Sequence, residues 1–365
     1  MTAYPGRLAG EPTTLTVAED GATVGDRHLD WLDVDDVRYG AHALTFVLPD
    51  GEAVEVTHLG RGFDACAAQV RTLRGAARRP ALTQGAFDPL VTFEARDLRA
   101  ATAGAEPPVT DVLLFPHALT VEPRGGPATC LPLPLVAAVE RDGWTLTLRM
   151  RGLDDVTLSG LGARTDELLQ RLDAARAELQ RATDAAYAET DPSLTGIDAP
   201  DGWALGPEDA GPRWEPMRAA WLARARGEQA RTLVGLAAPD GLRLGLWTEG
   251  GTLRLPFLLA ASGTGAAARV AVEAVDADDR ATFVFATDDL DRLNAALVQT
   301  AFRRDALALP DAELGRWAVA VRTQPVVRWA RERLVARVVH DVGWTAAVTA
   351  ALAADLHPRA EGDGR

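Results

Sequence analysis

The chain contains no lysine, so all 38 of its Lys and Arg residues are arginine. Without lysine there is no Schiff base, no lysine general base and no Walker-type phosphate-binding lysine. This absence excludes pyridoxal phosphate enzymes and ordinary P-loop NTPases. Serine is also scarce, because only Ser159, Ser193 and Ser262 occur in 365 residues. None lies in a G-x-S-x-G motif, and we interpret Ser159, at a predicted strand end, as structural rather than nucleophilic.

Cysteine is nearly absent. Cys66 and Cys130 are isolated and form no C-x-x-C pair, which is typical of small buried hydrophobic residues in a reducing cytoplasm. No run of 18 uninterrupted apolar residues occurs, so we predict no transmembrane helix. Residues 1–10 lack the apolar stretch of a signal peptide. We therefore expect a cytoplasmic protein.

Metal and cofactor motifs are missing as well. The six histidines include no H-x-x-x-H or H-E-x-x-H spacing, and we predict no catalytic residue, metal or cofactor. His58 could be a metal ligand together with Cys66, or a structural histidine at the end of a strand, and we favour the structural interpretation. The aspartates of residues 30–36 and 276–279 allow a cation site or ordinary turns, and their spacing favours turns. The glycines of residues 261–265 lead into another strand, which favours a connection over a phosphate loop.

The overall composition is that of a soluble globular protein, with 47% hydrophobic and 25% charged residues. The length allows two to four domains. The formal net charge is −14 and the isoelectric point is about 4.9. This charge argues against nucleic acid as a partner and disfavours an anionic membrane surface.

The sequence repeats itself after 102 residues. Matching positions without a gap include four pairs: Val37 and Val139, Leu44 and Leu146, Gly60 and Gly162, and Asp64 and Asp166. Upstream, residues 15–17 match residues 119–121 if two residues are gapped. Such self-similarity indicates two copies of one structural unit.

Each copy has the same predicted order of elements. An alternating first strand and a second extended segment precede a hairpin, and an amphipathic helix follows. The first strand is expected at residues 14–18 and 119–122, although residues 91–95 are also a candidate in the second copy. A weaker third copy is expected near residues 231–304, with a hairpin and a helix from Asp288.

This order of strands first and one helix last resembles the pleckstrin-homology (PH-like) superfold, including its bacterial GRAM-type relatives. The resemblance implies an α+β, mainly β, protein of three PH-like sandwich or barrel modules, each capped by a C-terminal helix, with further helices at the C-terminus. The expected division is module 1 at residues 1–80, module 2 with a long helix at 81–190, a linker at 191–212, a helix and divergent module 3 at 213–309, and C-terminal helices and tail at 310–365.

One basic run is a candidate binding surface. It contains six arginines and a single acidic residue: Arg316, Arg322, Arg328, Arg331, Arg333 and Arg337, with Glu332. Together with the interleaved tryptophans, the run would suit a membrane-surface or partner-binding helix. The apolar positions Val327, Ala330, Leu334 and Val338 suit a packed helix whose arginines pair with the acidic body, and we favour this interpretation.

The leading functional hypothesis is a non-enzymatic cytoplasmic scaffold that binds an unidentified protein partner, as PH-like domains often do. A first alternative is peripheral lipid binding through the arginine-rich helix. The PH-like resemblance argues against phosphoinositides, because the early turns at residues 19–21 and 123–126 hold one arginine between them. A second alternative is an enzyme with a carboxylate and arginine site of unfamiliar form.

Overall fold

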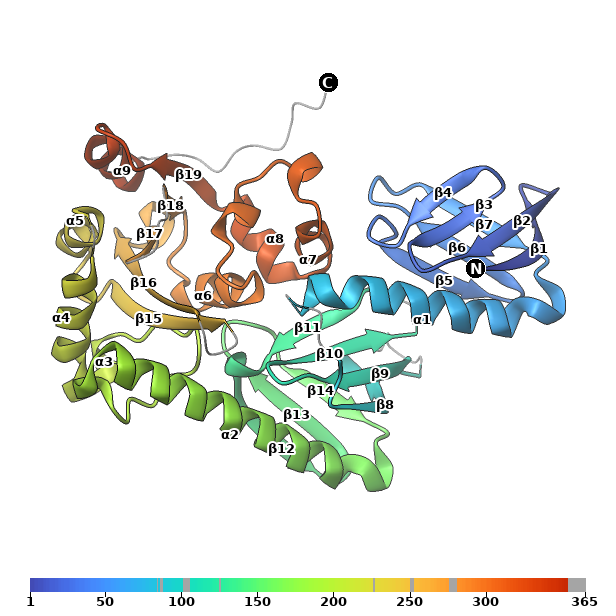
Figure 1. The fold of residues 1–365 in the computed structure, drawn as a ribbon, viewed down its shortest axis with the longest axis horizontal. Coiled ribbons are helices and arrows are strands. Elements are labelled where there is room, and N and C mark those ends of the chain that lie inside the picture. Colours follow the sequence, from blue (N-terminus) through green and yellow to red (C-terminus); the bar gives the residue numbers. More distant parts are fainter. Residues whose placement is uncertain are drawn as a thin grey trace.

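The computed structural model describes residues 1–83, 85, 88–100, 106–124, 126–225, 227–249, 253–275 and 281–353. Its strands form three antiparallel sheets, two with seven strands and one with five (Figure 1). About 39% of the chain is helical and 33% is in strands. The expectation of a mainly β protein is therefore wrong, because long helices connect the sheets and short helices surround the last one.

The first sheet and its helix form module 1. Its strands are β1 (Thr2–Leu8), β2 (Glu11–Val17), β3 (Gly21–Val24), β4 (Arg27–Asp30), β5 (Asp36–Gly40), β6 (Ala43–Val47) and β7 (Ala53–Thr57). Their order is β4-β3-β2-β1-β7-β6-β5. The first and last strands meet only where Arg7 pairs with Thr57 and Leu8 with Val56. The sheet thus consists of a four-stranded and a three-stranded part joined by a short bridge.

A short turn, η1 (Gly60–Gly62), leads into helix α1 (Phe63–Leu82), which closes module 1. Cys66, Ala67 and Val70 on α1 are buried in one hydrophobic core with strand residues such as Phe46. These helix positions recur at the spacing of one helical face, as the sequence pattern predicts. Burial of this stripe explains why the helix stays on the sheet.

Module 2 repeats this topology. Its strands are β8 (Val91–Asp97), β9 (Val109–Leu114), β10 (Ala118–Pro123), β11 (Thr129–Pro132), β12 (Val136–Asp142), β13 (Thr145–Met150) and β14 (Val156–Ser159). Their order, β11-β10-β9-β8-β14-β13-β12, is that of module 1 shifted by seven strands. The turn η4 (Gly162–Arg164) and helix α2 (Thr165–Thr190) follow.

Strand pairing tests the sequence repeat position by position. Leu44 pairs with Val56 in module 1, and Leu146 pairs with Leu158 in module 2, so the 102-residue shift holds for the last strands. The upstream match is wrong by one strand, because residues 15–17 lie in β2 and residues 119–121 lie in β10, the third strand of its module. The first strands are β1 and β8, and only the candidate at residues 91–95 was right. The connection between β8 and β9 contains more residues than that between β1 and β2. A single shift of 102 residues therefore cannot align the first strands as well as the last ones.

The third sheet has a different order, and we call residues 191–353 the third unit. Its strands are β15 (Leu242–Glu249), β16 (Leu253–Ser262), β17 (Arg269–Ala274), β18 (Ala281–Phe285) and β19 (Leu334–Val339), and each pairs with the next. This sequential order lacks the pairing of first and last strands seen in the other sheets. The third unit is therefore not a third copy of the same topology.

Helices surround the third sheet: α3 (Pro207–Ala210), α4 (Trp214–Arg224), α5 (Gln229–Leu236), α6 (Leu290–Gln299), α7 (Trp317–Thr323), α8 (Pro325–Glu332) and α9 (Trp344–Ala353). The expected boundary at residue 310 falls inside this unit, because β19 pairs with β18. Residues 191–212, expected to be a linker, are packed, with Leu194, Ile197 and Ala199 buried.

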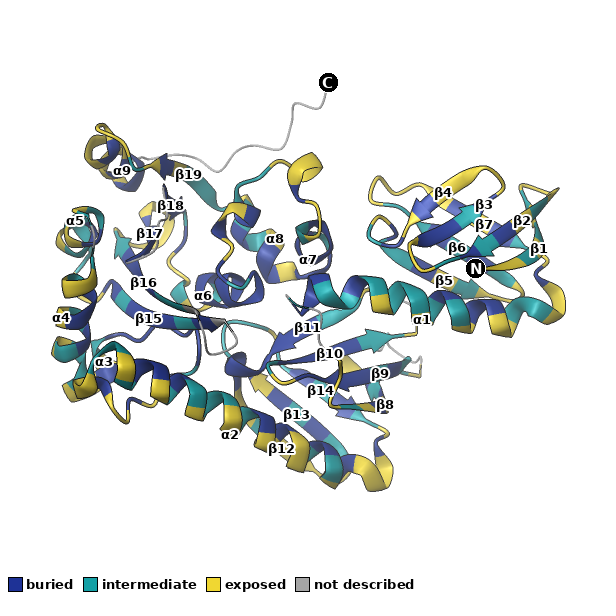
Figure 2. Cartoon of the chain, viewed as in Figure 1, coloured by how far each residue is buried: buried dark blue, intermediate teal, exposed yellow. Residues whose placement is uncertain are grey.

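Two large hydrophobic cores hold the chain together. Module 1 has a core of its own, whereas the second core runs from Phe93 on β8 to Leu352 on α9 and includes module 2 and the third unit. Figure 2 shows α1 and α2 with one buried and one exposed side. Both helices extend past their own sheets: Leu82 on α1 packs with residues of module 2 and α7, and Tyr187 on α2 stacks on Trp221 of α4 with ring centroids 6.0 Å apart.

Candidate functional site

The six arginines predicted as a binding surface lie on three elements, α7, α8 and β19, or next to them. The expected long helix is wrong beyond Glu332, because Leu334–Val339 form a strand that pairs with β18. Branched aliphatic side chains favour this edge position in the sheet. The apolar stripe that predicted a continuous helix is therefore divided between a helix and a strand.

Most of these arginines contact the protein itself. Arg331 donates to the carbonyls of Ala306 and Leu309, at 2.8 and 2.9 Å, and pairs with Asp311. Arg337 pairs with Asp305 at 3.1 Å. Arg316 lies 4.9 Å from the ring centroid of Trp317, and Arg333 lies 4.6 Å from that of Trp329. Arg328 is exposed on α8.

Arg322 has a different role, because it reaches from α7 to module 1. Its guanidinium donates to the carbonyl of Leu32 and lies 2.7 Å from the carboxylate of Asp35. The structure thus separates the six residues and brings only Arg322 near the cleft described next.

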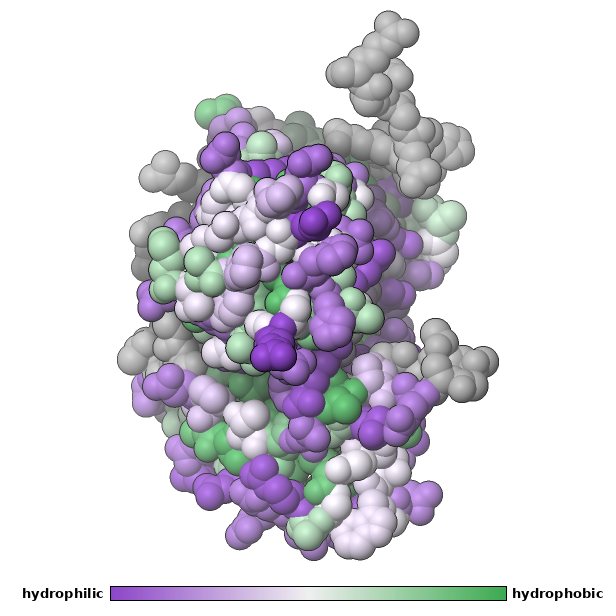
Figure 3. Space-filling model, turned by 90° about the vertical axis from the view of Figure 1, so that its right-hand side faces the viewer, coloured by the Kyte–Doolittle hydropathy of each residue, from purple (hydrophilic) through white to green (hydrophobic). Residues whose placement is uncertain are grey.

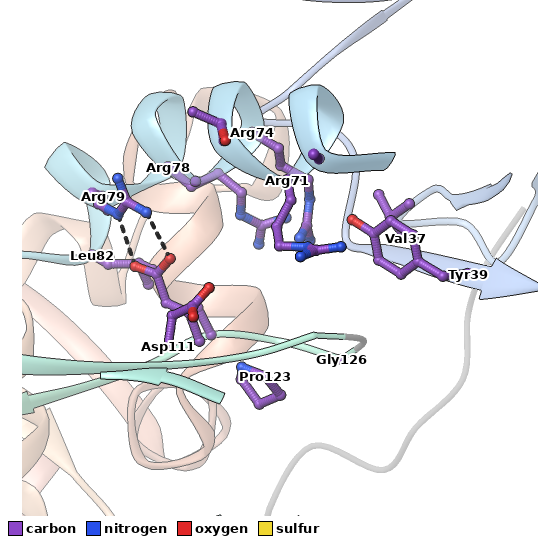
Figure 4. A pocket seen from close by; sticks show the side chains of 15 residues that line it. Val37, Tyr39, Arg71, Arg74, Arg78, Arg79, Leu82, Asp111, Pro123 and Gly126 are labelled. Carbon is purple, nitrogen blue, oxygen red and sulfur yellow. Dashed lines mark hydrogen bonds and ion pairs between the residues drawn. The ribbon is translucent and has the colours of Figure 1, made fainter. Parts of the chain in front are cut away.

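Four other arginines come together on α1: Arg71, Arg74, Arg78 and Arg79. They line a cleft of about 230 Å³ between α1, β5 of module 1 and the neighbouring strands β9 and β10 of module 2 (Figure 4). Steps of three and four residues place the first three on one side of the helix. We call this site the arginine cleft.

Arg79 closes one end of the arginine cleft. Its Nε and Nη2 donate to the two carboxylate oxygens of Glu122 on β10, at 2.9 and 3.0 Å (Figure 4). A Cβ at Gly75 would lie 2.9 Å from Nη2 of Arg79, so the glycine leaves room for this pair. A two-point pair of this kind fixes orientation as well as charge.

Arg74 and Arg78 support the loop that precedes β5. Arg74 donates through Nε and Nη2 to the carbonyl of Val34, at 3.3 and 3.2 Å, and through Nη2 to that of Asp35. Arg78 donates through Nη1 to the same two carbonyls. Burial lowers the pKa of Arg78 to about 9, and the neighbouring charge of Arg74 acts in the same direction. The positive charge of Arg78 is therefore poorly solvated by water.

Two donors at the arginine cleft have no partner in the described structure. These are Nε of Arg71 and Nη2 of Arg78, and both atoms are buried. Arg71 lies 5.3 Å from the ring centroid of Tyr39, which orients its guanidinium beside β5. A buried N–H without an acceptor costs free energy, which an incoming anion would recover.

The acidic groups around the cleft are engaged. Glu122 is held by Arg79, Asp111 lies 3.4 Å from Arg124, and Asp36 accepts a 2.9 Å hydrogen bond from the backbone of Gly126. The lining residues include four arginines and two carboxylates, Asp111 and Glu122. The described lining contains no histidine, cysteine or serine, so the arrangement supports anion binding and offers no nucleophile.

Other residues singled out in the sequence have local contacts. His58 is exposed just after the end of β7, and its Nδ1 lies 2.9 Å from the hydroxyl of Thr57. Cys66 is buried, so the two residues do not form a ligand pair at the surface. Asp30 accepts from the backbone of Leu32 at 2.8 Å, as a turn residue does. The described residues contain no group of three or more metal-ligating side chains. Residues 276–279 lie outside the described residues.

The turns used to judge phosphoinositide binding are not in the first hairpins. Residues 19 and 20 lie between β2 and β3, and Arg124 follows the last residue of β10. In module 1 the first hairpin turn instead connects Leu8 to Glu11. The α1 arginines could have been identified in the sequence, because four of the nine residues 71–79 are arginine and none is acidic, a denser basic run than residues 316–337.

No protein-family model matches the sequence, and a search of curated proteins finds no match. No helix in the described part of the chain combines the length and hydrophobicity that crossing a bilayer requires. The arginine cleft is therefore interpreted from its own geometry and chemistry.

Proposed function

We propose that this protein is a non-enzymatic interaction protein whose arginine cleft binds an acidic segment of a partner protein. One observation carries the proposal. Four arginines of α1 converge in a cleft between two modules, and the buried Nε of Arg71 and Nη2 of Arg78 have no acceptor there. Carboxylates bind guanidinium groups through charge-assisted hydrogen bonds, and arginine is well suited to such pairs.

The size of the arginine cleft limits what can enter. A volume of about 230 Å³ holds one or two side chains but no folded domain. The net charge of −14 repels anions from most of the surface, so a local cationic site would select the anion that also fits its shape. The occupant we propose is an extended segment with one or two Asp or Glu side chains.

The repeated modules support an interaction role as well. Strands followed by one closing helix resemble the PH-like superfold, whose members often bind peptides along a strand edge or beside the helix. Here the arginine cleft lies beside β5, an edge strand of the first sheet, and α1. We place the protein in the cytoplasm, where its two free, buried thiols would stay reduced.

Fluorescence anisotropy with labelled peptides tests this proposal. The probes are a flexible peptide containing six glutamates and the same peptide with six glutamines. We expect the glutamate peptide to bind more tightly, and its affinity to fall as salt rises from about 50 to 300 mM. Arg71→Gln should weaken binding about tenfold, because it removes one charge-assisted contact.

Arg61→Gln is the matched control, because Arg61 is exposed in the turn η1 that precedes α1 and does not line the arginine cleft. It should leave the affinity unchanged. Equal binding of both peptides, or equal losses in Arg71→Gln and Arg61→Gln, would contradict a specific acidic site.

A further inference from the structure

A second cavity lies where the parts of the chain meet. Its volume is about 340 Å³, and it is lined by the end of α1, the turn between β9 and β10, the β11 region, α2, β15 and the end of α6. Most of its wall is apolar, with Leu82, Leu179, Trp247 and Val298 among the lining residues. We call it the junction cavity. Cavities of this size between structural units are common small-molecule sites.

A buried acid, Asp201, lies in this mainly apolar wall. It is 3% exposed, and its carboxylate accepts hydrogen bonds from the backbone N–H of Thr248, at 2.8 Å, and from the Thr248 hydroxyl, at 3.0 Å. No arginine or histidine in the described part of the chain forms an ion pair with it, although buried carboxylates usually have such a partner. Burial raises the pKa of Asp201 to about 7.

The other titratable groups near the cavity do not provide a cation. His117 donates through Nε2 to the carbonyl of Thr83, at 2.7 Å, and burial lowers its pKa. Burial raises the pKa of the Cys130 thiol to about 12. Glu178 is a second acid at the cavity, and Tyr187 is a buried phenol whose pKa is raised by burial and by Asp201. A cation that reached Asp201 would therefore come from outside the chain.

We propose that the junction cavity binds a small, mainly apolar amine, with its ammonium group at Asp201 and its hydrocarbon part against Leu179, Trp247 and Val298. The ammonium group supplies the missing counter-charge, and carboxylate oxygens can accept further hydrogen bonds beside those from Thr248. Burial of the hydrocarbon in the apolar wall adds a hydrophobic contribution. This inference does not depend on the arginine cleft.

The physical reason for a charged ligand is the balance between solvation and pairing. A lone carboxylate in an apolar wall is disfavoured, so the empty cavity favours the protonated acid. A bound ammonium group stabilises the ionised carboxylate of Asp201 through an ion pair with hydrogen bonds. A neutral ligand provides no such charge, so the carboxyl group stays protonated. The cavity should therefore distinguish an amine from a neutral molecule of the same shape.

Isothermal titration calorimetry with three matched probes tests this inference on the full chain. The probes are 4-phenylbutylamine, 4-phenylbutan-1-ol and 4-phenylbutyrate, which share a phenyl ring and an alkyl chain. We expect the amine to bind at least about tenfold more tightly than the alcohol, and the carboxylate to bind most weakly. In Asp201→Asn the preference for the amine should disappear.

Two variants keep the test decisive. Asp198→Asn is the matched control, because Asp198 is exposed, close in sequence and absent from the cavity lining, and it should preserve the preference. Ala182→Leu adds volume on α2 without touching Asp201, and it should weaken the amine and the alcohol alike. If wild type binds neither probe, binds both equally, or prefers the carboxylate, the proposal is overturned. The same holds if Asp201→Asn or Ala182→Leu binds the amine as wild type does.

Discussion

Module 1 and module 2 have the same strand order and the same closing helix, yet they are attached to the rest of the chain differently. The core of module 1 is separate, whereas that of module 2 is continuous with the third unit. Module 1 is attached by a few polar contacts and a small apolar cluster: Arg322 donates to the carbonyl of Leu32, Arg79 pairs with Glu122, and Leu82 packs on module 2 and α7. Topology alone therefore does not determine whether a repeated unit is independent.

The difference can be traced to single positions. Gly51 and Gly152 occupy the last hairpin turn of module 1 and module 2, and both have positive φ. A Cβ at Gly51 would meet nothing within 4 Å, whereas a Cβ at Gly152 would lie 2.3 Å from the carbonyl oxygen of Asp291. Module 2 thus presents this turn to the third unit, and module 1 presents its turn to solvent.

The largest expected effects are in the two cores. Phe46→Ala and Phe283→Ala each remove a buried ring and should each cost about 3–5 kcal/mol of unfolding free energy. Phe46→Ala should increase hydrogen exchange in module 1 alone, while Phe283→Ala should increase it in both module 2 and the third unit. Hydrogen exchange mass spectrometry in mild denaturant checks this. Faster exchange in β8–β14 of Phe46→Ala would show that the cores are coupled.

A pH-dependent effect should be confined to the larger core. The pKa of Asp201 is raised from 3.8 to about 7 on folding, so the folded state retains a proton that the unfolded state releases. Below about pH 4 both states hold the proton, and the contribution of Asp201 to the free energy of unfolding is fully present. As the pH rises from about 4 through 7, the unfolded state loses the proton first, and this contribution is lost. Between pH 5 and 7, wild type should lose roughly 2–3 kcal/mol relative to Asp201→Asn.

Denaturant midpoints at both pH values measure this loss. Asp198→Asn is the control and should follow wild type, because its carboxylate is exposed. Parallel pH profiles of wild type and Asp201→Asn would rule out a proton held by Asp201.

The two hairpin glycines give a matched comparison between the modules. Gly152→Ala combines positive φ with overlap on Asp291 and should cost about 3 kcal/mol. Gly51→Ala has only the backbone strain and should cost about 1 kcal/mol. Equilibrium unfolding in urea measures both. Equal costs would mean that the turn of module 2 can move away from α6 without loss.

The most local expected effect concerns the polar attachment of module 1. Arg322→Ala removes the donor to the carbonyl of Leu32 and the ion pair with Asp35, at a cost of about 1–3 kcal/mol. The loss should appear as faster hydrogen exchange in residues 31–36 and α7, while the sheet of module 1 remains protected. Arg328→Ala, at an exposed position on α8, is the control and should change neither segment.

The sequence predicts part of this architecture for clear physical reasons. The last two strands and the helix of each module were identified because their spacing is constant, with Gly60 matching Gly162 at the same turn. The first strand of module 1 was missed, and β8 was only one of two candidates in module 2, because β1 and β8 are separated from their successors by loops of different length. The fifth strand of the third sheet, β19, was read as helix because Leu334 and Val338 also fit a helical stripe, and only pairing with β18 decides between the two.

The candidate sites depend on contacts that one chain segment does not reveal. Arg71, Arg74 and Arg78 show helical spacing in the sequence, but the carbonyls of Val34 and Asp35 that hold two of them come from a distant loop. The junction cavity is harder still, because its wall is assembled from α1, module 2 and the third unit. In the sequence, Asp201 is one aspartate in an acidic stretch, and its burial follows only from long-range packing.

The extension of α1 past its own sheet has a consequence for length variation. The helix carries Val70 in one core and Leu82 in another cluster, so it sets both the distance and the rotational phase between them. Each inserted residue would advance the far end by about 1.5 Å and turn it by about 100°. Seven residues make nearly two whole turns, so insertions that keep both faces aligned come in steps of about seven. Inserting seven residues between Val70 and Leu82 would move module 1 about 10 Å away from module 2 and thereby open the arginine cleft.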